Sequence, residues 1–436
     1  MHPFIRPVYA IAGRVAEVAA ASIPVGRGKV GRSIAARKDV VHRFERWSQT
    51  YRDLSQPLIW IHAPSVGEGL QARPVLHALK AAHPRCQFVY TFFSPSAASF
   101  AATLDVDFRD VLPFDTARAG RAIIEALRPA VILFSKLDVW PNLLEEAHVR
   151  GVPTALISAT LSARSSRNST LAAMVLRDSY SRLSAVGAIS AADGARLVAL
   201  GCRNDAVQVT GDTRFDQVAG RASRIGRASD LLDPLRSDRL TLVAGSTWPA
   251  DEKVLLAALT DRRVGKMGLR VIIAPHEPTP SHLAPIEHWA AERGLRHARM
   301  TDADAGAVDV LVVDRLGVLG DLYALADIAF VGGGFHAAGL HSVLEPASYG
   351  VPVLFGRQHA SSRDAALLID AGGGRDVRNS EELAVALGEW LADPGARQTA
   401  GRAAQQLITD NCGATARTVA LIEAITAGVL PFPDGR

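Results

Sequence analysis

The sequence predicts an α/β protein built from two doubly wound domains with parallel sheets that face each other across a cleft. Three observations carry this prediction. The chain has 436 residues, which is too long for one ordinary hydrophobic core. Apolar strands alternate with helical stretches from residue 57 onward, and the alternation resumes at residue 240 after a charged segment without periodicity. Hydrophobic residues make up 48% of the chain and charged residues 21%, so both domains are expected to be globular.

Residues 1–50 form a basic, apolar segment that we expect to associate with a membrane surface. Residues 1–60 hold ten Lys and Arg against four acidic residues. Arg6, Arg14 and Glu17 interrupt the apolar start, so it contains no run of about 18 apolar residues that could span a membrane. The basic residues follow the apolar part, which is the reverse of their order in a signal peptide. An interfacial helix is expected, the alternative being an amphipathic helix packed on the domain.

Residues 51–216 are predicted to form the N-terminal domain. Five apolar segments have the length of buried strands, and helical stretches separate most of them. The strands are expected at residues 58–63, 87–92, 130–135, 154–159 and 184–190. Ligands of doubly wound sheets bind beyond the carboxyl ends of the strands, and polar residues follow three of these ends.

The first strand end carries a candidate base. Ser65, Gly67 and Glu68 follow this strand, and a helix begins near Gly67. Glu68 then lies in the first turn of the helix with its carboxylate facing the cleft. The alternative is structural, because acidic side chains at helix N-termini also act as caps and complement the helix dipole.

Two further strand ends carry charged groups. Lys136 and Asp138 follow the third strand, close to an aromatic residue, although Asp138 and Asn142 are equally typical of local turns and caps. Residues 160–167 include two arginines that can meet a phosphate or a carboxylate. We interpret this last segment as a solvated loop.

Residues 217–238 are predicted to link the two domains, because they are charged and show no periodicity. The C-terminal domain is expected over residues 239–410, followed by a closing helix at 411–436. Its strands are expected at residues 240–245, 270–274, 309–313, 327–331 and 351–355. Gly245, Ser246 and Thr247 end the first of them in a short turn whose N–H groups and hydroxyls can hold a phosphate.

A glycine-rich turn is the most distinctive feature of the second domain. Gly333 and Gly334 belong to a triple glycine that follows a strand, and a helix is expected to begin near His341 with Glu345 about one turn into it. Backbone N–H groups there suit an anion, and the carboxylate can accept hydrogen bonds from sugar hydroxyls. The alternative is that the glycines only allow a helix to pack closely.

Several ligand classes are not expected. The chain contains no GxxxxGK[ST] segment and no GxGxxG in its first βα unit, so a P-loop ATPase and a classical dinucleotide domain are disfavoured. No HExxH or comparable pattern suggests a metal site, and Cys86, Cys202 and Cys412 form no CxxC pair or disulfide framework. A reducing cytoplasm is therefore favoured, without metal or other cofactor. The arrangement suits transfer from a nucleotide-activated donor bound to the second domain.

Seven sequence blocks identify the family that the chain resembles. They are WIHAPSVGE, LDVWPNL, TGDTRFD, VAGSTW, ALADIAFVGGG, HSVLEPASYGVPVLFG and GATART. In this order they resemble the 3-deoxy-D-manno-octulosonic acid (Kdo) transferases of lipopolysaccharide assembly, from about residue 58 to residue 418. The resemblance implies a GT-B fold with an acceptor-binding and a donor-binding Rossmann-like domain, and a final helix that crosses back to the first domain.

The resemblance also implies the reaction. It is the transfer of Kdo from CMP-Kdo to a hydroxyl of the lipid A precursor (lipid IVA), with inversion and without a metal. Such enzymes lie on the cytoplasmic face of the bacterial inner membrane, peripheral or monotopic, and no nucleic-acid partner is expected. Glu68 matches the family's general base, and Asp138 matches the acid before WPN, which supports the acceptor or the transferred sugar. The 245–247 turn would meet the CMP phosphate and Glu345 the ribose.

Further positions are expected to support the substrates. Around the acceptor or donor these are Ser65, Gly67, Lys136 and Arg214, and around the donor they are His276, Gly333, Gly334 and His341. The chain departs from the commoner family pattern where many members read PRH, because here His276 stands in place of an arginine expected near the phosphate. Lys136 would restore a cation. The rival interpretations are another GT-B sugar transferase or nucleotide-sugar epimerase, and a non-catalytic scaffold at the membrane surface.

Overall fold

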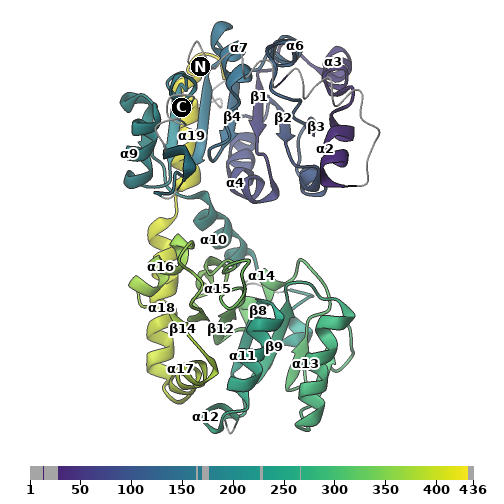
Figure 1. Cartoon of the computed structure of the whole chain (residues 1–436), viewed down its shortest axis with the longest axis vertical. Helices are drawn as coiled ribbons and strands as arrows, with labels where there is room; N and C mark the ends of the chain where they lie inside the picture. The colour runs from purple at the N-terminus through teal and green to yellow at the C-terminus, as the bar shows by residue number, and fades with distance from the viewer. Residues whose placement is uncertain are drawn as a thin grey trace. The chain divides into compact units, whose positions relative to one another are not determined.

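The computed structural model describes Gly13 and residues 28–163, 165–168, 176–225, 229–265 and 267–430. The chain divides into two compact units (Figure 1). The first combines Met1–Asp216 with Cys412–Arg436, and the second is Gln217–Asn411. Most of the apolar start, for which we predict membrane association, lies outside the described residues. No helix within the described ranges is long and apolar enough to cross a membrane.

The first unit contains a parallel sheet of seven strands in the order β3-β2-β1-β4-β5-β6-β7. The strands are β1 (Leu58–His62), β2 (Gln87–Phe92), β3 (Phe108–Val111), β4 (Val131–Ser135), β5 (Thr154–Ala159), β6 (Ala185–Ala188) and β7 (Val207–Val209). Every residue of the central strands β1, β2, β4 and β5 is buried, which is what continuous apolar strands achieve when helices cover both faces of a sheet. The order reverses at β1 and β4, whose carboxyl ends therefore border the usual ligand site of such a sheet.

Helices cover both faces of this sheet. They are α2 (Lys29–Arg37), α3 (Val40–Tyr51), α4 (Val66–Ala82), α5 (Ala98–Ala102), α6 (Ala117–Leu127), α7 (Pro141–Val149), α9 (Ala191–Leu200) and α19 (Ala414–Ile425). Helix α3 buries Val40, Phe44 and Trp47, and Phe44 meets the ring of Phe108 edge-on at 5.0 Å. The apolar face of residues 40–51 therefore belongs to the protein core and is not available to lipid.

Helix α19 completes the first unit although it follows the second unit in the sequence. It packs on α4 and β6, and Leu421 and Ile422 join the core around the sheet. Asp216 holds the start of this helix, because its carboxylate accepts hydrogen bonds from the N–H groups of Gly413 and Thr415, each at 2.6 Å. His83 lies 3.0 Å from Glu423 and joins the end of α4 to the same helix.

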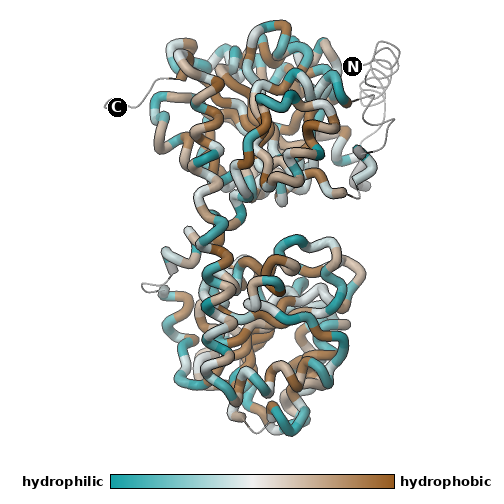
Figure 2. Tube along the Cα trace, turned by 90° about the vertical axis from the view of Figure 1, so that its left-hand side faces the viewer, coloured by the Kyte–Doolittle hydropathy of each residue, from teal (hydrophilic) through white to brown (hydrophobic). Residues whose placement is uncertain are grey.

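The second unit contains another seven-stranded parallel sheet, in the order β10-β11-β9-β8-β12-β13-β14. Its strands are β8 (Thr241–Thr247), β9 (Arg270–Pro275), β10 (His297–Arg299), β11 (Val310–Val312), β12 (Ile328–Val331), β13 (Val353–Gly356) and β14 (Gly374–Val377). Its helices are α11 (Pro249–Leu259), α12 (Arg262–Gly265), α13 (Pro280–Glu292), α14 (Leu319–Leu322), α15 (Leu344–Ser348), α16 (Arg363–Asp370), α17 (Ser380–Ala392) and α18 (Pro394–Asn411). Figure 2 shows hydrophobic stretches of chain running through the inside of each unit.

Two predicted segments differ in the structure. The predicted linker at 217–238 begins inside helix α10 (Thr213–Ile225) and then buries Leu232 and Leu235 against the second unit, so much of it is ordered structure. The helix expected to begin near His341 begins at Leu344, which makes Glu345 its second residue. The residues before Leu344 form an extended loop that follows the triple glycine.

Candidate active site

Glu68 lies at the carboxyl edge of the first sheet, where β1 turns into α4. Ser65 is the residue before the helix, and Gly67 and Glu68 are its second and third residues. The Glu68 side chain is 19% exposed, and its Oε1 lies 3.6 Å from Nζ of Lys136. Its Oε2 is buried without a hydrogen-bond partner among the described residues. Because neither oxygen accepts a bond from the helix N–H groups described here, the side chain does not act as a cap in this conformation.

Lys136 is held beside Glu68 by an uncommon backbone conformation. Its φ is +69°, in the left-handed region that non-glycine residues rarely occupy outside functional sites and turns. The preceding residue, Ser135, donates a hydrogen bond from its hydroxyl to the Glu68 backbone carbonyl at 3.0 Å. The end of β4 and the start of α4 are therefore fixed to each other, which places a cation next to the candidate base.

Asp138 is paired with an arginine that our sequence interpretation left in a solvated loop. Nη2 of Arg167 lies 2.7 Å from Oδ1 of Asp138, and its Nη1 donates to Leu137 O and to Tyr180 Oη. Tyr180 also donates to the Leu137 carbonyl at 2.7 Å. The loop at 160–167 is therefore partly structured. The sequence left a carboxylate partner open for its arginines but did not identify Asp138 as the partner of Arg167.

His62 holds the aromatic part of the WPN block. Trp140 donates from Nε1 to His62 Nε2 at 3.0 Å, so the His62 proton is on Nδ1, which donates to the Thr91 hydroxyl at 2.9 Å. Burial lowers the pKa of His62 to about 3, so the ring is neutral at physiological pH. Trp140 in turn stacks on Phe93 at 4.9 Å. This network fixes the loop that follows β4.

Two other residues near this edge are engaged within the first unit. Asn142 is a structural residue, because its side-chain amide donates to the Asp115 carbonyl and its N–H donates to the Asp115 carboxylate. Arg214 lies in the first turn of α10 and pairs with the buried carboxylate of Asp212 at 2.7 Å. The support role expected for Arg214 stays a prediction.

In the second unit, the turn at Gly245–Thr247 is tightly packed. A Cβ on Gly245 would lie 2.2 Å from Tyr323 Oη, so only glycine fits there. Ser246 has a φ of +54°, again in the left-handed region. Thr247 is buried and donates its hydroxyl to Glu252 at 2.9 Å. The hydroxyl of Thr247 is thus used inside the protein, and the half-exposed Ser246 is the better candidate to meet a ligand.

The triple glycine serves close packing more than our sequence interpretation allowed. The Gly332 N–H donates to the Gly245 carbonyl, and the N–H groups of Gly333 and Phe335 donate to Asp251 at 2.7 and 3.0 Å. A Cβ on Gly334 would lie 2.4 Å from the backbone of the β13 end. Two N–H groups of the triple glycine, those of Gly332 and Gly333, are therefore satisfied internally, as is that of the following Phe335. Gly333 and Gly334 stay predictions as donor-binding positions.

Four aromatic rings gather at the carboxyl ends of β8, β9 and β12. Trp248 follows β8, His276 follows β9, and His336 and His341 come from the loop after β12. The Trp248 ring stacks on His336 at 4.2 Å and on His276 at 4.6 Å, and His276 stacks on His341 at 4.6 Å. The sequence singled out His276 and His341 but missed Trp248 and His336. The VAGSTW block was the signal available for Trp248.

Glu345 is half-buried beside an ion pair of the second unit. Arg221 of α10 lies 2.6 Å from Asp321, and the guanidinium acts electrostatically on Glu345. Burial raises the pKa of Glu345, and the positive charge of Arg221 opposes this effect. Gly320 leaves room for Arg221, because a Cβ there would lie 2.5 Å from its Nη1. The carboxylate is thus kept close to a cation without a direct ion pair.

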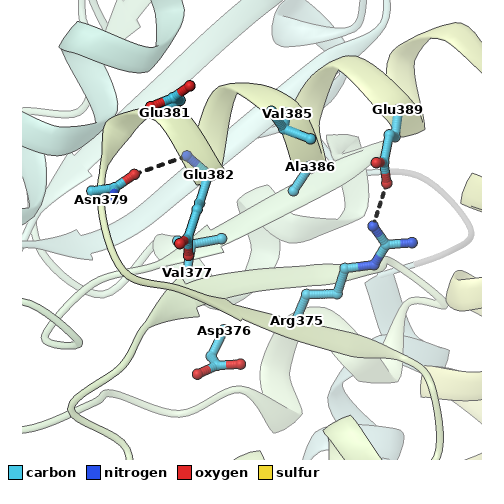
Figure 3. A pocket seen from close by; sticks show the side chains of 9 residues that line it. All are labelled: Arg375, Asp376, Val377, Asn379, Glu381, Glu382, Val385, Ala386 and Glu389. Atoms are coloured by element: carbon cyan, nitrogen blue, oxygen red, sulfur yellow. Dashed lines mark hydrogen bonds and ion pairs between the residues drawn. The ribbon is translucent and has the colours of Figure 1, made fainter.

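One hollow lies away from all of these groups. It has a volume of about 420 Å³ and lies between β14 and α17, with Arg375 paired to Glu389 and Asn379 accepting from the Glu382 N–H (Figure 3). None of the predicted site residues lines it. No group of three or more His, Cys, Asp and Glu side chains within the described ranges is placed to hold a metal ion.

Comparisons with known proteins bear on the whole chain. Residues 38–217 match the family model of 3-deoxy-D-manno-octulosonic-acid transferase (kdotransferase). The 3-deoxy-D-manno-octulosonic acid transferase of Bordetella pertussis is 31% identical over 84% of this chain and 86% of its own length. That of Haemophilus influenzae is 25% identical over the same shares.

A solved structure supports the fold. The UDP-GlcNAc 2-epimerase of Neisseria meningitidis is 14% identical, covers 85% of this chain and all of its own, and superposes with a TM-score of 0.62. At this level of identity the likeness is one of fold alone. Together with the two seven-stranded parallel sheets, it confirms the predicted GT-B fold class.

Proposed function

Because the chain belongs to the 3-deoxy-D-manno-octulosonic acid transferase family, we propose that it moves Kdo from CMP-Kdo to a hydroxyl of a lipid A precursor, with inversion at the anomeric carbon. The relatives are named for the transfer of this sugar. The single observation that carries the mechanism is the carboxylate of Glu68, which has a buried oxygen without a hydrogen-bond partner beside Lys136.

Glu68 acts as the general base in this proposal. The acceptor hydroxyl gives its proton to Oε2 of Glu68 as its oxygen attacks the anomeric carbon, and the bond from that carbon to the CMP phosphate breaks. One base and one displacement invert the configuration without a covalent intermediate. Nζ of Lys136 lies 3.6 Å from Oε1 and places a positive charge beside the carboxylate. The Lys136 side chain is 42% exposed, so it can also meet an anionic group of a substrate.

The remaining groups of the first unit orient the acceptor or the sugar. Asp138 presents a carboxylate whose position is fixed by Arg167, and both side chains are partly exposed. Ser65 and Gly67 form the wall of the turn next to Glu68 and leave it open, because a Cβ on Gly67 would meet only the Ser65 hydroxyl at 3.8 Å.

The second unit binds the nucleotide in this proposal. Ser246 and the backbone around it contact the phosphate, with His276 beside them, and Glu345 accepts hydrogen bonds from the ribose hydroxyls. In this proposal the backbone N–H groups of the turn, with His276 beside them, meet the negative charge of the leaving phosphate. CMP is the leaving group, and it departs with the electron pair of the broken bond.

Membrane association is proposed for the basic N-terminal segment. Within its described part, Arg32 and Lys38 are exposed on or next to α2, whereas the apolar face of α3 is buried in the core. Attraction of basic residues to anionic headgroups, at about 1 kcal/mol per residue near the surface, would hold the enzyme at the cytoplasmic face of the inner membrane where its lipid acceptor is found.

The test is a transfer assay with CMP-Kdo generated in situ and a tetraacylated lipid A precursor, with products identified by mass. Wild type is expected to form the product, and Glu68→Gln and Glu68→Ala are expected to lose about 10²-fold or more in rate. The control is Asp205→Asn, which alters an exposed acid of the same unit. Full activity of folded Glu68 variants would remove the base role, and a folded wild type that forms no product but binds another nucleotide sugar would favour a different sugar transferase.

A further inference from the structure

The four stacked rings at the edge of the second sheet differ in the hydrogen bonds that their nitrogens make. An indole Nε1 can only donate, so the bond of 3.2 Å from Trp248 requires His341 Nε2 to be an acceptor. The proton of His341 is then on Nδ1 and the ring is neutral. Burial and the neighbouring His276 lower the pKa of His341, in agreement with this assignment.

His336 is also held in one neutral form. Its Nδ1 accepts a hydrogen bond from the Ala338 N–H at 3.2 Å, so its proton is on Nε2. The His336 ring covers the face of Trp248 at 4.2 Å. Two of the three histidines in the stack therefore each use one ring nitrogen to accept a hydrogen bond within the protein.

His276 is the exception. Its backbone N–H donates to the Thr247 carbonyl at 2.9 Å, but neither ring nitrogen has a hydrogen-bond partner among the described residues. The ring is half-exposed and lies flat against Trp248 at 4.6 Å, an arrangement in which an indole face attracts a cation. Both ring nitrogens are thus left for a proton and a ligand.

The charged and titratable groups around His276 come from several elements. Helix α11 contributes Asp251, whose carboxylate is engaged by N–H groups, and Glu252, whose carboxylate accepts from Thr247. Helix α13 contributes His282, which bonds to the Glu277 carbonyl. Glu277 itself is exposed and follows His276 in the chain. The carboxylates of Asp251 and Glu252 are thus engaged by other groups of the protein and form no hydrogen bond with the His276 ring among the described residues.

We infer that His276 is the one proton-bearing ring of this stack and that, when protonated, it is the cation that binds the phosphate of the nucleotide donor. Trp248 is a positioning residue, since it holds His341 neutral and stacks on His276. The inference rests on the proposed function and adds to it that donor affinity depends on one proton.

The probe for the test is cytidine 5′-methyl phosphate, a diester whose single negative charge stays constant between pH 5.5 and 8. CMP itself is unsuitable, because its phosphate monoester titrates near pH 6. Calorimetry on the full chain is expected to show affinity falling towards tenfold per pH unit on the alkaline side of the His276 titration. His276→Arg is expected to bind equally well at all pH values, and at least tenfold more tightly than wild type at pH 8.

Two further variants separate charge from structure. His276→Gln is expected to bind weakly at every pH, close to wild type at pH 8. Trp248→Phe keeps a ring in the stack but removes the hydrogen-bond donor to His341. The pH at which this variant has lost half of its affinity for the diester is expected to differ from that of wild type. A pH dependence that persists in His276→Gln, or its absence in wild type, would overturn the inference while leaving donor binding intact. A wild type that does not bind the diester at any pH would overturn the donor assignment as well.

Discussion

The burial of His62 leads to a prediction of how the stability of the first unit depends on pH. The ring is fully buried and is neutral because Trp140 and Thr91 occupy its two nitrogens. Its pKa is about 3 in the folded protein, and a histidine in an unfolded chain has a pKa of about 6.5. The unfolded state therefore binds more protons below pH 6.5, and the stability contribution is complete above that value and is lost as pH falls towards 3.

The magnitude follows from the difference between these two pKa values. Each pH unit below 6.5 removes about 1.4 kcal/mol, so lowering the pH from 7 to 5 costs the first unit about 2 kcal/mol through His62 alone. His62→Gln keeps an acceptor for Trp140 and cannot be protonated, so it should be less stable at pH 7 but lose about 2 kcal/mol less on acidification.

The assay must report on the first unit by itself, because two units need not unfold together. Urea-dependent hydrogen exchange, followed by mass spectrometry on peptides from β1 and β4, measures the opening of this sheet. His288→Gln, which alters an exposed histidine of the second unit, is the control. Equal losses of stability on acidification in wild type and His62→Gln would refute the assignment of a buried, neutral His62.

Two other substitutions test the packing of each unit. Gly334→Ala should lower the stability of the second unit by about 1–3 kcal/mol, because the added Cβ would lie 2.4 Å from the β13 backbone. The control is Gly220→Ala, in open space on α10, which should stabilise the protein by about 0.5–1 kcal/mol. Calorimetric unfolding measures both changes, and equal effects of the two substitutions would contradict the packing argument. Asp216→Asn should speed hydrogen exchange in residues 414–425 about tenfold, because it weakens the two hydrogen bonds that hold the start of α19. Asp410→Asn is the control. Unchanged exchange in Asp216→Asn would show that α19 is held by its apolar face alone.

The interior strands were predictable from the sequence and the edge strands were not. The segments at 58–63, 87–92, 130–135 and 154–159 are continuously apolar because both faces of a central parallel strand are buried. The four strands without a prediction, β3, β7, β10 and β14, are the edges of the two sheets. Edge strands are partly exposed, as in Val207–Val209, so they lack the apolar run that identifies a buried strand.

The candidate site was predictable where a motif lies beside a strand end. Glu68 and Lys136 are found together because the ends of β1 and β4 are adjacent in a parallel sheet. The pairing of Arg167 with Asp138 was missed since it joins residues from two different loops, and no periodicity reports such a contact. His62 was missed because a histidine within an apolar strand gives no sign of its hydrogen-bond partners.

The start of the helix that bears Glu345 was also misplaced, for a local reason. Ser342 and Glu345 have the S-x-x-E spacing of a capping box, which is typical of a helix start just after Ser342. In the structure the helix begins at Leu344, and Val343, the residue before it, makes no side-chain cap. Three N–H groups of the glycine-rich turn are occupied by Asp251 and Gly245, contacts that depend on the fold of the whole unit. The sequence left both ligand binding and close packing open for this turn, because it does not report such contacts.

The position of α19 has a consequence for synthesis of the protein on the ribosome. Leu421 and Ile422 fill the core of the first unit, yet about 200 residues of the second unit are made before them. The second unit can close its core while the unit that carries Glu68 still exposes the faces of α4 and β6. The part of the enzyme that is translated first is therefore the part that finishes folding last, and a chain that stopped before residue 412 would present a complete second unit next to an unfinished first one.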